Sequence, residues 1–368
     1  MQVGREATVA DVAAVRARFG GRAAILIETT LLRRRAGVKL PGTADWLFTD
    51  EALQQATAAP VAAHRATRLA GRAVHDVTCS IGGELSALRD SATALVGSDL
   101  DPVRLAMARH NLGDQILLCR ADALAPVTRD TVVVADPARR AGGRRRFDPR
   151  DYIPALDRLA EVYRGRDLVV KCSPGIDFDA LPGLGHDGEV ELVSLAGSVR
   201  EACLWSPGLA DPGVARRAVI LDRAEQYTDA DPAESGVAAA GRWIVDPDGA
   251  VVRAGLVRQY AARHGLWQLD PHIAYLSGDR LPAGVRGFEV LEELAYSENR
   301  LRRALAANDC GACEILVRGM DVDPDGLRRR LRLRGTRALS VVLTRIGTGA
   351  ASRPVAFVCR AARQTSGG

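Results

Sequence analysis

Between residues 71 and 222, short apolar runs alternate with segments in which apolar residues recur at helical spacing. Apolar runs of roughly four to eight residues bounded by turn residues are typical of buried strands, and the intervening periodicity is typical of amphipathic helices. The alternation predicts a parallel sheet with crossover helices. The predicted parallel strands are Ala73–Val77, Ala94–Ser98, Gln115–Cys119, Thr131–Ala135 and Asp167–Lys171.

Capping residues predict where the helices between these strands begin. Asp101-Pro102 and Asp148-Pro149 each place a capping carboxylate before a proline, which favours a helix that starts at the proline. The second helix would then have an apolar face made of Tyr152, Leu156, Leu159 and Tyr163. Three later apolar runs have no helices between them, which predicts an antiparallel end to the sheet. These runs are Glu189–Leu195, Val199–Trp205 and Ala218–Leu221.

The pattern differs on either side of this region. Residues 1–70 are predicted to be helical, with Thr49 as a cap before Asp50 and Glu51. Residues 223–284 are rich in Asp, Pro and Gly, and we expect a connector with some short elements. Residues 285–368 alternate again and predict a small α+β domain. Its expected elements are strand Gly287–Leu291, helix Ser297–Ala307, strand Glu314–Val317, helix Pro324–Leu333, strand Leu339–Arg345 and strand Val355–Cys359. The predicted division is therefore 1–70, 71–222, 223–284 and 285–368.

Charge is distributed unevenly along the 368 residues, which carry +5 overall. Only Lys39 and Lys171 are lysines, so 48 of the 50 basic residues are arginines, a bias that GC-rich codons would also produce. Residues 285–368 hold fifteen arginines and nine acids, a charge of +6, which leaves −1 for the rest. A basic module on a near-neutral body favours a polyanionic partner, above all nucleic acid.

Composition argues against several classes of protein. The apolar runs are too short to span a membrane, so we expect no membrane partner. The N-terminus has no basic start followed by an apolar stretch, so secretion is not expected. The seven cysteines are odd in number and widely spread, which argues against a disulfide framework and favours the reducing cytoplasm.

Acidic residues follow four successive predicted strands. The loop from Asp76 to Gly83 leads into a helix, where glycines and free N–H groups favour a negative ligand group. Asp99 lies twenty-three residues after Asp76, close to the spacing of about 20 for a ribose-binding acid. Asp122 could accept a hydrogen bond from an adenine amino group, and Asp136 ends the fourth strand. The ordered set predicts a nucleotide-type site at the carboxyl edge of the sheet, although the missing G-x-G-x-x-G disfavours a nicotinamide enzyme.

These loops resemble motifs I to IV of class I S-adenosylmethionine-dependent methyltransferases. The similar runs are Asp76-Val-Thr-Cys-Ser-Ile-Gly-Gly, Gly97-Ser-Asp-Leu-Asp-Pro, Arg120-Ala-Asp and Ala135-Asp-Pro-Ala-Arg. Within that class, the sequence is most similar to the trimethylguanosine-synthase-like RNA methyltransferases. Residues 285–368 resemble the THUMP-like domain of bacterial members. The resemblance implies a Rossmann-like seven-stranded sheet that binds S-adenosyl-L-methionine.

The resemblance also implies roles for individual residues. The methionine end of the cofactor would lie against Asp76 and Gly82, the ribose against Asp99 and the adenine against Asp122. The full implied cofactor-binding set is Asp76, Thr78, Cys79, Gly82, Gly83, Asp99, Leu100, Asp122 and Ala123.

Asp136 and Pro137 are the implied catalytic residues, and they would orient the accepting nitrogen of an RNA base. The expected RNA is a tRNA or rRNA, and a single-stranded or loop target is favoured because a paired base must first be flipped out. The arginine-rich run after Asp136 could clamp phosphates. The expected substrate contacts are Arg139, Arg140, Arg144, Arg145 and Phe147.

Two of the motifs depart from the family pattern. Ser80 stands where motif I usually has a glycine. Ala138 and Arg139 stand where an aromatic residue often stacks on the target base, which leaves base specificity open and Phe147 as a candidate replacement. The second departure also keeps a catalytically inactive RNA-binding protein as an alternative, because a fold does not establish activity.

Cysteine motifs raise further alternatives. Cys172 follows Lys171 in a run that resembles the nucleophile motif of uracil-C5 methyltransferases, and a neighbouring ammonium would activate the thiolate. We prefer a buried strand cysteine, because no C-terminal base motif matches. Cys310 and Cys313 form a single C-x-x-C without a second pair, so no metal site is expected. A small-molecule methyltransferase is also possible, but it would not need the basic C-terminal domain.

Overall fold

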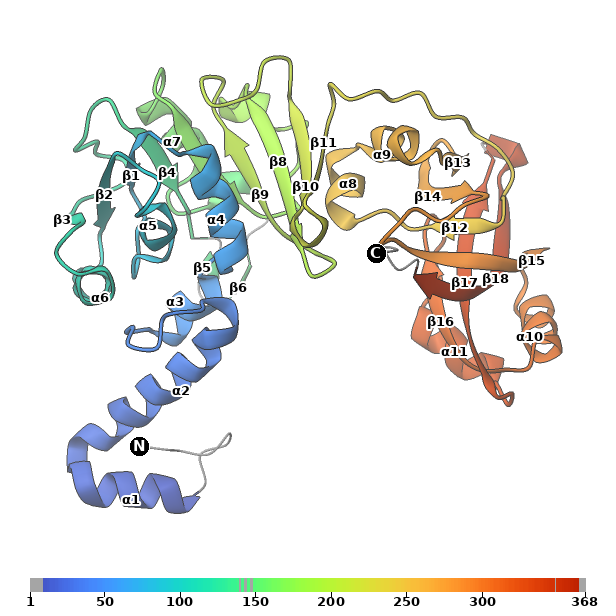
Figure 1. Cartoon of the computed structure of the whole chain (residues 1–368), viewed down its shortest axis with the longest axis horizontal. Helices are drawn as coiled ribbons and strands as arrows, with labels where there is room; N and C mark the ends of the chain where they lie inside the picture. The colour runs from blue at the N-terminus through green and yellow to red at the C-terminus, as the bar shows by residue number, and fades with distance from the viewer. Residues whose placement is uncertain (1–8, 139, 142–143, 146–147, 348, 364–368) are drawn as a thin grey trace. The chain divides into compact units, whose positions relative to one another are not determined.

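The computed structural model describes residues 9–138, 140–141, 144–145, 148–347 and 349–363 (Figure 1). The chain forms two compact units, one of residues 1–195 and 200–212 and the other of residues 196–199 and 213–368. The four predicted segments therefore group into two, because the helical segment at 1–70 belongs to the first unit and residues 223–284 belong to the second.

Seven helices and nine strands are described in the first unit, two of the strands being two residues long. The helices are α1 Val9–Phe19, α2 Ala23–Lys39, α3 Asp50–Gln55, α4 Ala59–Arg68, α5 Gly83–Leu88, α6 Pro102–Leu112 and α7 Leu156–Val162. The strands are β1 Ala73–Asp76, β2 Ala94–Asp99, β3 Leu117–Arg120, β4 Val132–Ala135, β5 Arg140–Ala141, β6 Arg144–Arg145, β7 Leu168–Cys172, β8 Glu189–Leu195 and β9 Ser198–Trp205.

The predicted parallel sheet is confirmed. Within the first unit, seven strands of the sheet follow one another in the order β8-β9-β7-β4-β1-β2-β3. The pairs β2–β3, β1–β2, β1–β4 and β4–β7 are parallel, whereas β7 and β9 are antiparallel, as the helix-free runs near the end of the sheet predicted. Because β1 lies between β2 and β4, the strand order reverses direction next to β1, which is where open α/β sheets bind ligands.

Helix α4 and helix α5 cover part of this sheet. Their buried residues Ala66 and Leu88 pack with Val74 of β1, Val134 of β4 and Trp205 of β9 in one apolar cluster. The predicted caps also hold, since Thr49 accepts a hydrogen bond from Ala52 and Asp101 accepts from Val103 and Arg104. Helix α4 therefore packs against the sheet, while residues of α2 and α3 form a second apolar cluster with Ile81.

The helix predicted to begin after Asp148 begins later. Asp148 caps only a three-residue 3-10 turn, Pro149–Asp151, and α7 starts at Leu156. Pro154 explains the delay, because a proline disfavours the helical conformation of the residue before it. The expected apolar face is nevertheless buried, at Tyr152, Leu156, Leu159 and Tyr163.

The second unit contains nine strands and four helices among its described residues. Its strands are β10 Arg216–Ile220, β11 Glu225–Thr228, β12 Trp243–Val245, β13 Trp267–Asp270, β14 Ile273–Gly278, β15 Arg286–Ala295, β16 Cys310–Val317, β17 Arg337–Ile346 and β18 Arg353–Arg363. Its helices are α8 Gly249–Ala254, α9 Val257–His264, α10 Glu298–Ala307 and α11 Pro324–Leu331.

The stretch at 223–284 is more than the expected connector. Its strands β12, β13 and β14 join the C-terminal strands in one sheet of order β13-β14-β12-β15-β18-β17-β16. Strand β12 has only three residues and pairs with β15, whose residues Gly287–Glu289 lie more than forty positions later. A strand this short leaves almost no periodicity to detect, and its partner is remote in sequence.

Both faces of strand β17, an inner strand of this second sheet, are buried. Along β17, Val341 and Leu343 join an apolar cluster with Leu301 of α10 and Leu327 of α11. Val342, whose side chain points the opposite way, joins a second cluster with Ile244 of β12 and other residues. The predicted α+β elements at 285–368 are therefore one half of a larger unit.

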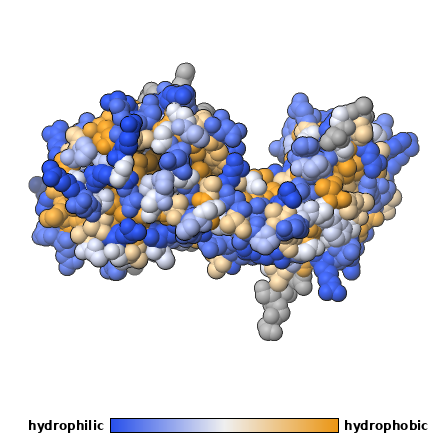
Figure 2. All heavy atoms as spheres, turned by 90° about the horizontal axis from the view of Figure 1, so that it is seen from above, coloured by the Kyte–Doolittle hydropathy of each residue, from blue (hydrophilic) through white to orange (hydrophobic). Residues whose placement is uncertain are grey.

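The surface shows no dominant apolar face in the view of Figure 2, where hydrophobic residues are interspersed among hydrophilic ones. No helix in the described part of the chain is long and apolar enough to cross a membrane.

Candidate active site

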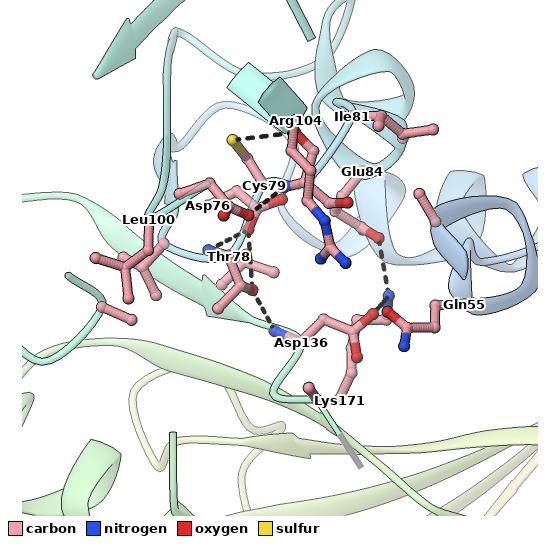
Figure 3. A pocket seen from close by; sticks show the side chains of 18 of the residues that line it. Gln55, Asp76, Thr78, Cys79, Ile81, Glu84, Leu100, Arg104, Asp136 and Lys171 are labelled. Carbon is pink, nitrogen blue, oxygen red and sulfur yellow. Dashed lines mark hydrogen bonds and ion pairs between the residues drawn. The ribbon is translucent and has the colours of Figure 1, made fainter. Parts of the chain in front are cut away.

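A cavity of about 360 Å³ opens at the carboxyl edge of the first sheet (Figure 3). It is lined by an acidic residue at or after the end of each of β1, β2, β3 and β4, together with Lys171 of β7. The four acids are Asp76, Asp99, Asp122 and Asp136. The structure therefore brings together the four strand ends that the sequence singled out.

Most of the implied cofactor-binding residues line this cavity. Besides the acids, these are Thr78, Cys79, Gly83, Leu100 and Ala123. Gly82 is not among the lining residues. Its φ is 89°, and a Cβ at this position would stand 2.5 Å from Leu112 Cδ1. Backbone conformation and packing therefore explain why this residue is a glycine. Pro137 is also not among the lining residues, whereas Ala138 is.

The loop after β1 is tied to the loop after β4. Asp76 Oδ1 accepts hydrogen bonds from the main-chain N of Thr78 at 3.0 Å and from its Oγ1 at 3.4 Å. The same Thr78 Oγ1 accepts from the main-chain N of Asp136 at 2.6 Å. Thr78 therefore fixes the spacing between the first and the fourth acid, a positioning role that the sequence did not reveal.

Asp99 organises two loops at once. Its Oδ2 accepts from Ser80 N and its Oδ1 from Asp101 N, both at 2.9 Å. Ser80 has a φ of 49°, in the left-handed region where glycine is favoured, so the departure from the usual motif I keeps the glycine-like backbone.

The third loop is held similarly. Asp122 Oδ1 accepts from Leu124 N at 2.9 Å, and Ala123 O accepts from Tyr163 Oη at 2.7 Å. Two lining side chains are apolar yet 58% exposed, Leu100 and Ile153. Exposed large apolar side chains in a cavity wall are suited to cover a planar ring.

The cavity wall is strongly charged. Burial, and then the nearby Glu84 carboxylate, raises the pKa of Asp76 to about 7. Burial also opposes ionisation of Glu84, but Arg65 and Lys171 outweigh it and lower the pKa of Glu84. Burial disfavours the charged form of Lys171, yet Asp136 and Glu84 outweigh it and raise the pKa of that lysine. Asp76, which can gain or lose a proton near neutral pH, thus lies beside Glu84 and Lys171, which stay charged there.

Several lining residues were missed by the sequence analysis. Gln55 comes from α3, Arg104 from α6 and Glu84 from α5. Their spacing from the strand ends follows no recognisable sequence pattern, so only the fold shows that these three residues line the cavity. The sequence pattern indicates Lys171 only as a neighbour of Cys172, although its being one of two lysines is a further signal.

The remaining candidates lie elsewhere or outside the described residues. Cys172 is fully buried and does not line the cavity, because adjacent residues on a strand point to opposite faces and Lys171 takes the cavity side. The arginine-rich run forms a two-stranded antiparallel ladder, β5–β6, through the backbones of Arg140 and Arg145. Arg139 and Phe147, and the side chains of Arg140, Arg144 and Arg145, fall outside the part that the structure describes.

Cys310 and Cys313 are both buried in strand β16. In the described ranges, no group of three or more His, Cys, Asp or Glu side chains is arranged to hold a metal ion.

Comparison with known proteins places the chain in a family. Two curated proteins of Mycobacterium tuberculosis, from strains CDC 1551 / Oshkosh and ATCC 25618 / H37Rv, are each 67% identical over 358 residues, covering 95% of this chain and 100% of theirs. Both are described as uncharacterized S-adenosylmethionine-dependent methyltransferases. The THUMP domain-like family matches residues 285–361.

A solved structure shares the fold. It is a protein of Porphyromonas gingivalis W83, provisionally assigned as a methyltransferase, with a TM-score of 0.74 and 19% identity over 96% of this chain and 99% of its own. Together with the near-full-length relatives, these findings identify the chain as a member of the S-adenosylmethionine-dependent methyltransferases.

Proposed function

We propose that this methyltransferase acts on RNA and transfers the methyl group to a nitrogen of a nucleobase. The observation that carries the proposal is that Asp136 and Ala138 line the cavity and that the arginine-rich run 139–146 follows Ala138 directly in the sequence. A dense arginine run beside an active site is suited to hold a phosphate backbone. The THUMP domain-like match at 285–361, in a stretch of net charge +6, supports a nucleic-acid substrate.

The residues present fit S-adenosylmethionine. The cavity volume of about 360 Å³ lies in the range of small-molecule sites. Both oxygens of Asp99 are oriented by main-chain N–H groups and keep lone pairs for two ribose hydroxyls. The buried acid Asp76 suits the cationic methionine end, while Asp122 and the exposed Leu100 suit the adenine.

Asp136 is the proposed catalytic residue. The cofactor, when bound, supplies a methyl group on a positively charged sulfur that leaves readily. Asp136 would accept a hydrogen bond from the accepting amine and direct the nitrogen lone pair toward that methyl. The accepting nitrogen would displace the methyl group from sulfur, which would keep the electron pair of the broken bond, and the Asp136 carboxylate would stabilise the positive charge on nitrogen until its proton is lost to water.

The alternative of a uracil-C5 methyltransferase is less well supported. A nucleophilic cysteine must reach the base, but Cys172 is fully buried and does not line the cavity. Stacking of the target base by Phe147 and phosphate contacts by Arg139, Arg140, Arg144 and Arg145 remain parts of the proposal.

Nucleoside mass spectrometry tests the proposal directly. Total RNA from wild-type cells, from deletion cells and from deletion cells carrying Asp136→Asn would be digested and compared. We expect one methylated nucleoside to disappear on deletion, to return with the wild-type gene and to stay absent with Asp136→Asn. An unchanged set of nucleosides, with methylation of a small molecule instead, would contradict it.

A further inference from the structure

A row of alternating charges runs from the interior of the first unit to the cavity. Arg65 is paired with Glu201 and donates from Nε to Glu84 Oε1 at 2.6 Å. Lys171 Nζ then lies 3.8 Å from Glu84 Oε2 and donates to Asp136 Oδ2 at 2.6 Å (Figure 3). The row thus links helix α4, helix α5, strand β7 and the loop after β4.

The side chains of this row are almost fully buried except for Asp136, which lies at the cavity. The side chains of Arg65, Glu84 and Lys171 are 2%, 6% and 7% exposed, whereas Asp136 is 28% exposed. Removing such charges from water costs several kcal/mol for each ion, and well-packed apolar residues often stabilise a core as much or more. A gain in stability therefore does not account for these buried charges. A need to hold the Asp136 carboxylate in one orientation does account for them.

Asp136, at the exposed end of the row, is held at two points. The main-chain N of Asp136 donates to Thr78 Oγ1, and Oδ2 of its carboxylate accepts from Lys171. Among the described residues, Asp136 Oδ1 has no hydrogen-bond partner. Lys171 lies in strand β7, where it pairs with Cys203 of β9, and β4 pairs with β7 on the other side, so its backbone is fixed by the sheet. The carboxylate is thereby fixed with one oxygen left for a substrate.

We propose that Lys171 is a positioning residue for methyl transfer: its ammonium holds Asp136 through Oδ2 and leaves Oδ1 for the accepting nitrogen. Glu84 and Arg65 hold the lysine in turn. The inference deepens the proposed function and rests on it, because it gives Lys171 a role in the reaction assigned to Asp136. Loss of this contact would let the carboxylate rotate, and a small misplacement in an active site can cost about 10²-fold in rate.

The lysine content allows a test that needs no substrate. Because the chain has only Lys39 and Lys171, ¹³C-labelled lysine gives two side-chain NMR signals, which Lys39→Arg assigns. The charged groups around Lys171 include Asp136, Glu84, Arg65, Glu201 and Lys39. The pKa of Lys171 is raised, whereas burial, and then the charge of Lys171, lower the pKa of Lys39. We expect the Lys171 signal to titrate at higher pH than Lys39. In Asp136→Asn, the Lys171 titration should move to lower pH by more than that of Lys39. A Lys171 titration unchanged by Asp136→Asn would overturn the proposed pair.

Kinetics then separate positioning from a merely structural role. Lys171→Met should lower kcat on RNA from deletion cells by about 10²-fold while the Kd for S-adenosylmethionine changes by less than about threefold. Lys171→Arg, which keeps the charge, should recover part of the rate. Equal losses of cofactor binding and rate in Lys171→Met would overturn the inference.

The failures of the two proposals are distinguishable. If wild-type protein methylates RNA and Lys171→Met does so at the wild-type rate, only the inference about Lys171 fails. If wild-type protein methylates no RNA, the proposed function fails, and the positioning role fails with it; the NMR titration then judges only the Lys171–Asp136 pair.

Discussion

At the scale of single residues, each strand-end acid first shapes its own loop and then faces the cavity. Asp99 holds the main chain at Ser80 and Asp101, and Asp122 holds it at Leu124. An aspartate after a strand is an ordinary turn residue, so such bonds alone indicate no site. Convergence of four such acids on one cavity is what distinguishes them.

Ser80 provides a prediction about stability. A non-glycine residue at a φ of 49° stores roughly 1–3 kcal/mol of strain, which glycine would not. Ser80→Gly should therefore stabilise the first unit by about 1 kcal/mol, after the cost of glycine's greater freedom in the unfolded chain. Urea unfolding measures the change. Ser86→Gly, inside helix α5, is the matched control and should destabilise by about 0.5 kcal/mol. Equal destabilisation by both variants would contradict the prediction.

Asp76 provides a prediction about pH. Its pKa of about 7 in the free protein means that a proton is bound below that pH and absent above it. A cationic ligand group favours the ionised form of Asp76, so S-adenosylmethionine should bind more tightly as the pH rises from about 6 to about 8. Near pH 6, where Asp76 is protonated in the free protein, binding should release a proton. Calorimetry in buffers of different ionisation enthalpy measures both effects.

Asp76→Asn is the control for that experiment. It can still accept the bond from Thr78 N, but it cannot titrate. The pH dependence that remains in this variant belongs to the ligand's own amino group, whose pKa is about 8. Identical pH profiles for the two proteins would show that Asp76 does not respond to the ligand.

At the scale of elements, the C-terminal half of the second unit presents a basic helix end. Arg329, Arg332 and Arg334, at and after the end of α11, are exposed and have no ion pair with a described residue. Their neighbours Arg328 and Arg330 are committed to Asp325 and Glu298. We call the three unpaired residues the α11 arginine cluster.

The α11 arginine cluster should contribute to RNA affinity through phosphate contacts. Replacing all three with Gln should weaken binding of bulk tRNA and reduce the slope of log affinity against log salt by about two. Fluorescence anisotropy at several salt concentrations, with the full-length chain, measures both. The matched control replaces Arg286, Arg302 and Arg328, which pair with Glu314, Glu298 and Asp325. A larger effect from the control set would contradict the assignment.

At the scale of the whole molecule, the two compact units predict two unfolding steps. All residues that line the cavity belong to the first unit. The cofactor at about 100 times its Kd should therefore stabilise the first unit by about 2.7 kcal/mol and leave the second unchanged. Differential scanning calorimetry with and without S-adenosylmethionine measures this. A single transition that shifts as a whole would indicate that the units unfold together.

Much of the first unit could be predicted because its signals are local. An apolar run such as Val132–Ala135 is buried on both faces, so its character survives in the sequence alone. Asp101 and Thr49 cap helices through contacts within three residues. The helix expected after Asp148 failed where a second local signal, Pro154, overrode the cap.

The sequence by itself determined the parallel sheet, its antiparallel end and the acids at its strand ends, because parallel strands bring their carboxyl ends to one edge. Only the tertiary structure decided that Glu84 and Lys171 join those acids, since an ion pair across 87 positions leaves no spacing to detect. Only the tertiary structure likewise decided that β12 pairs with β15, because their apolar residues are buried only when the two strands come together.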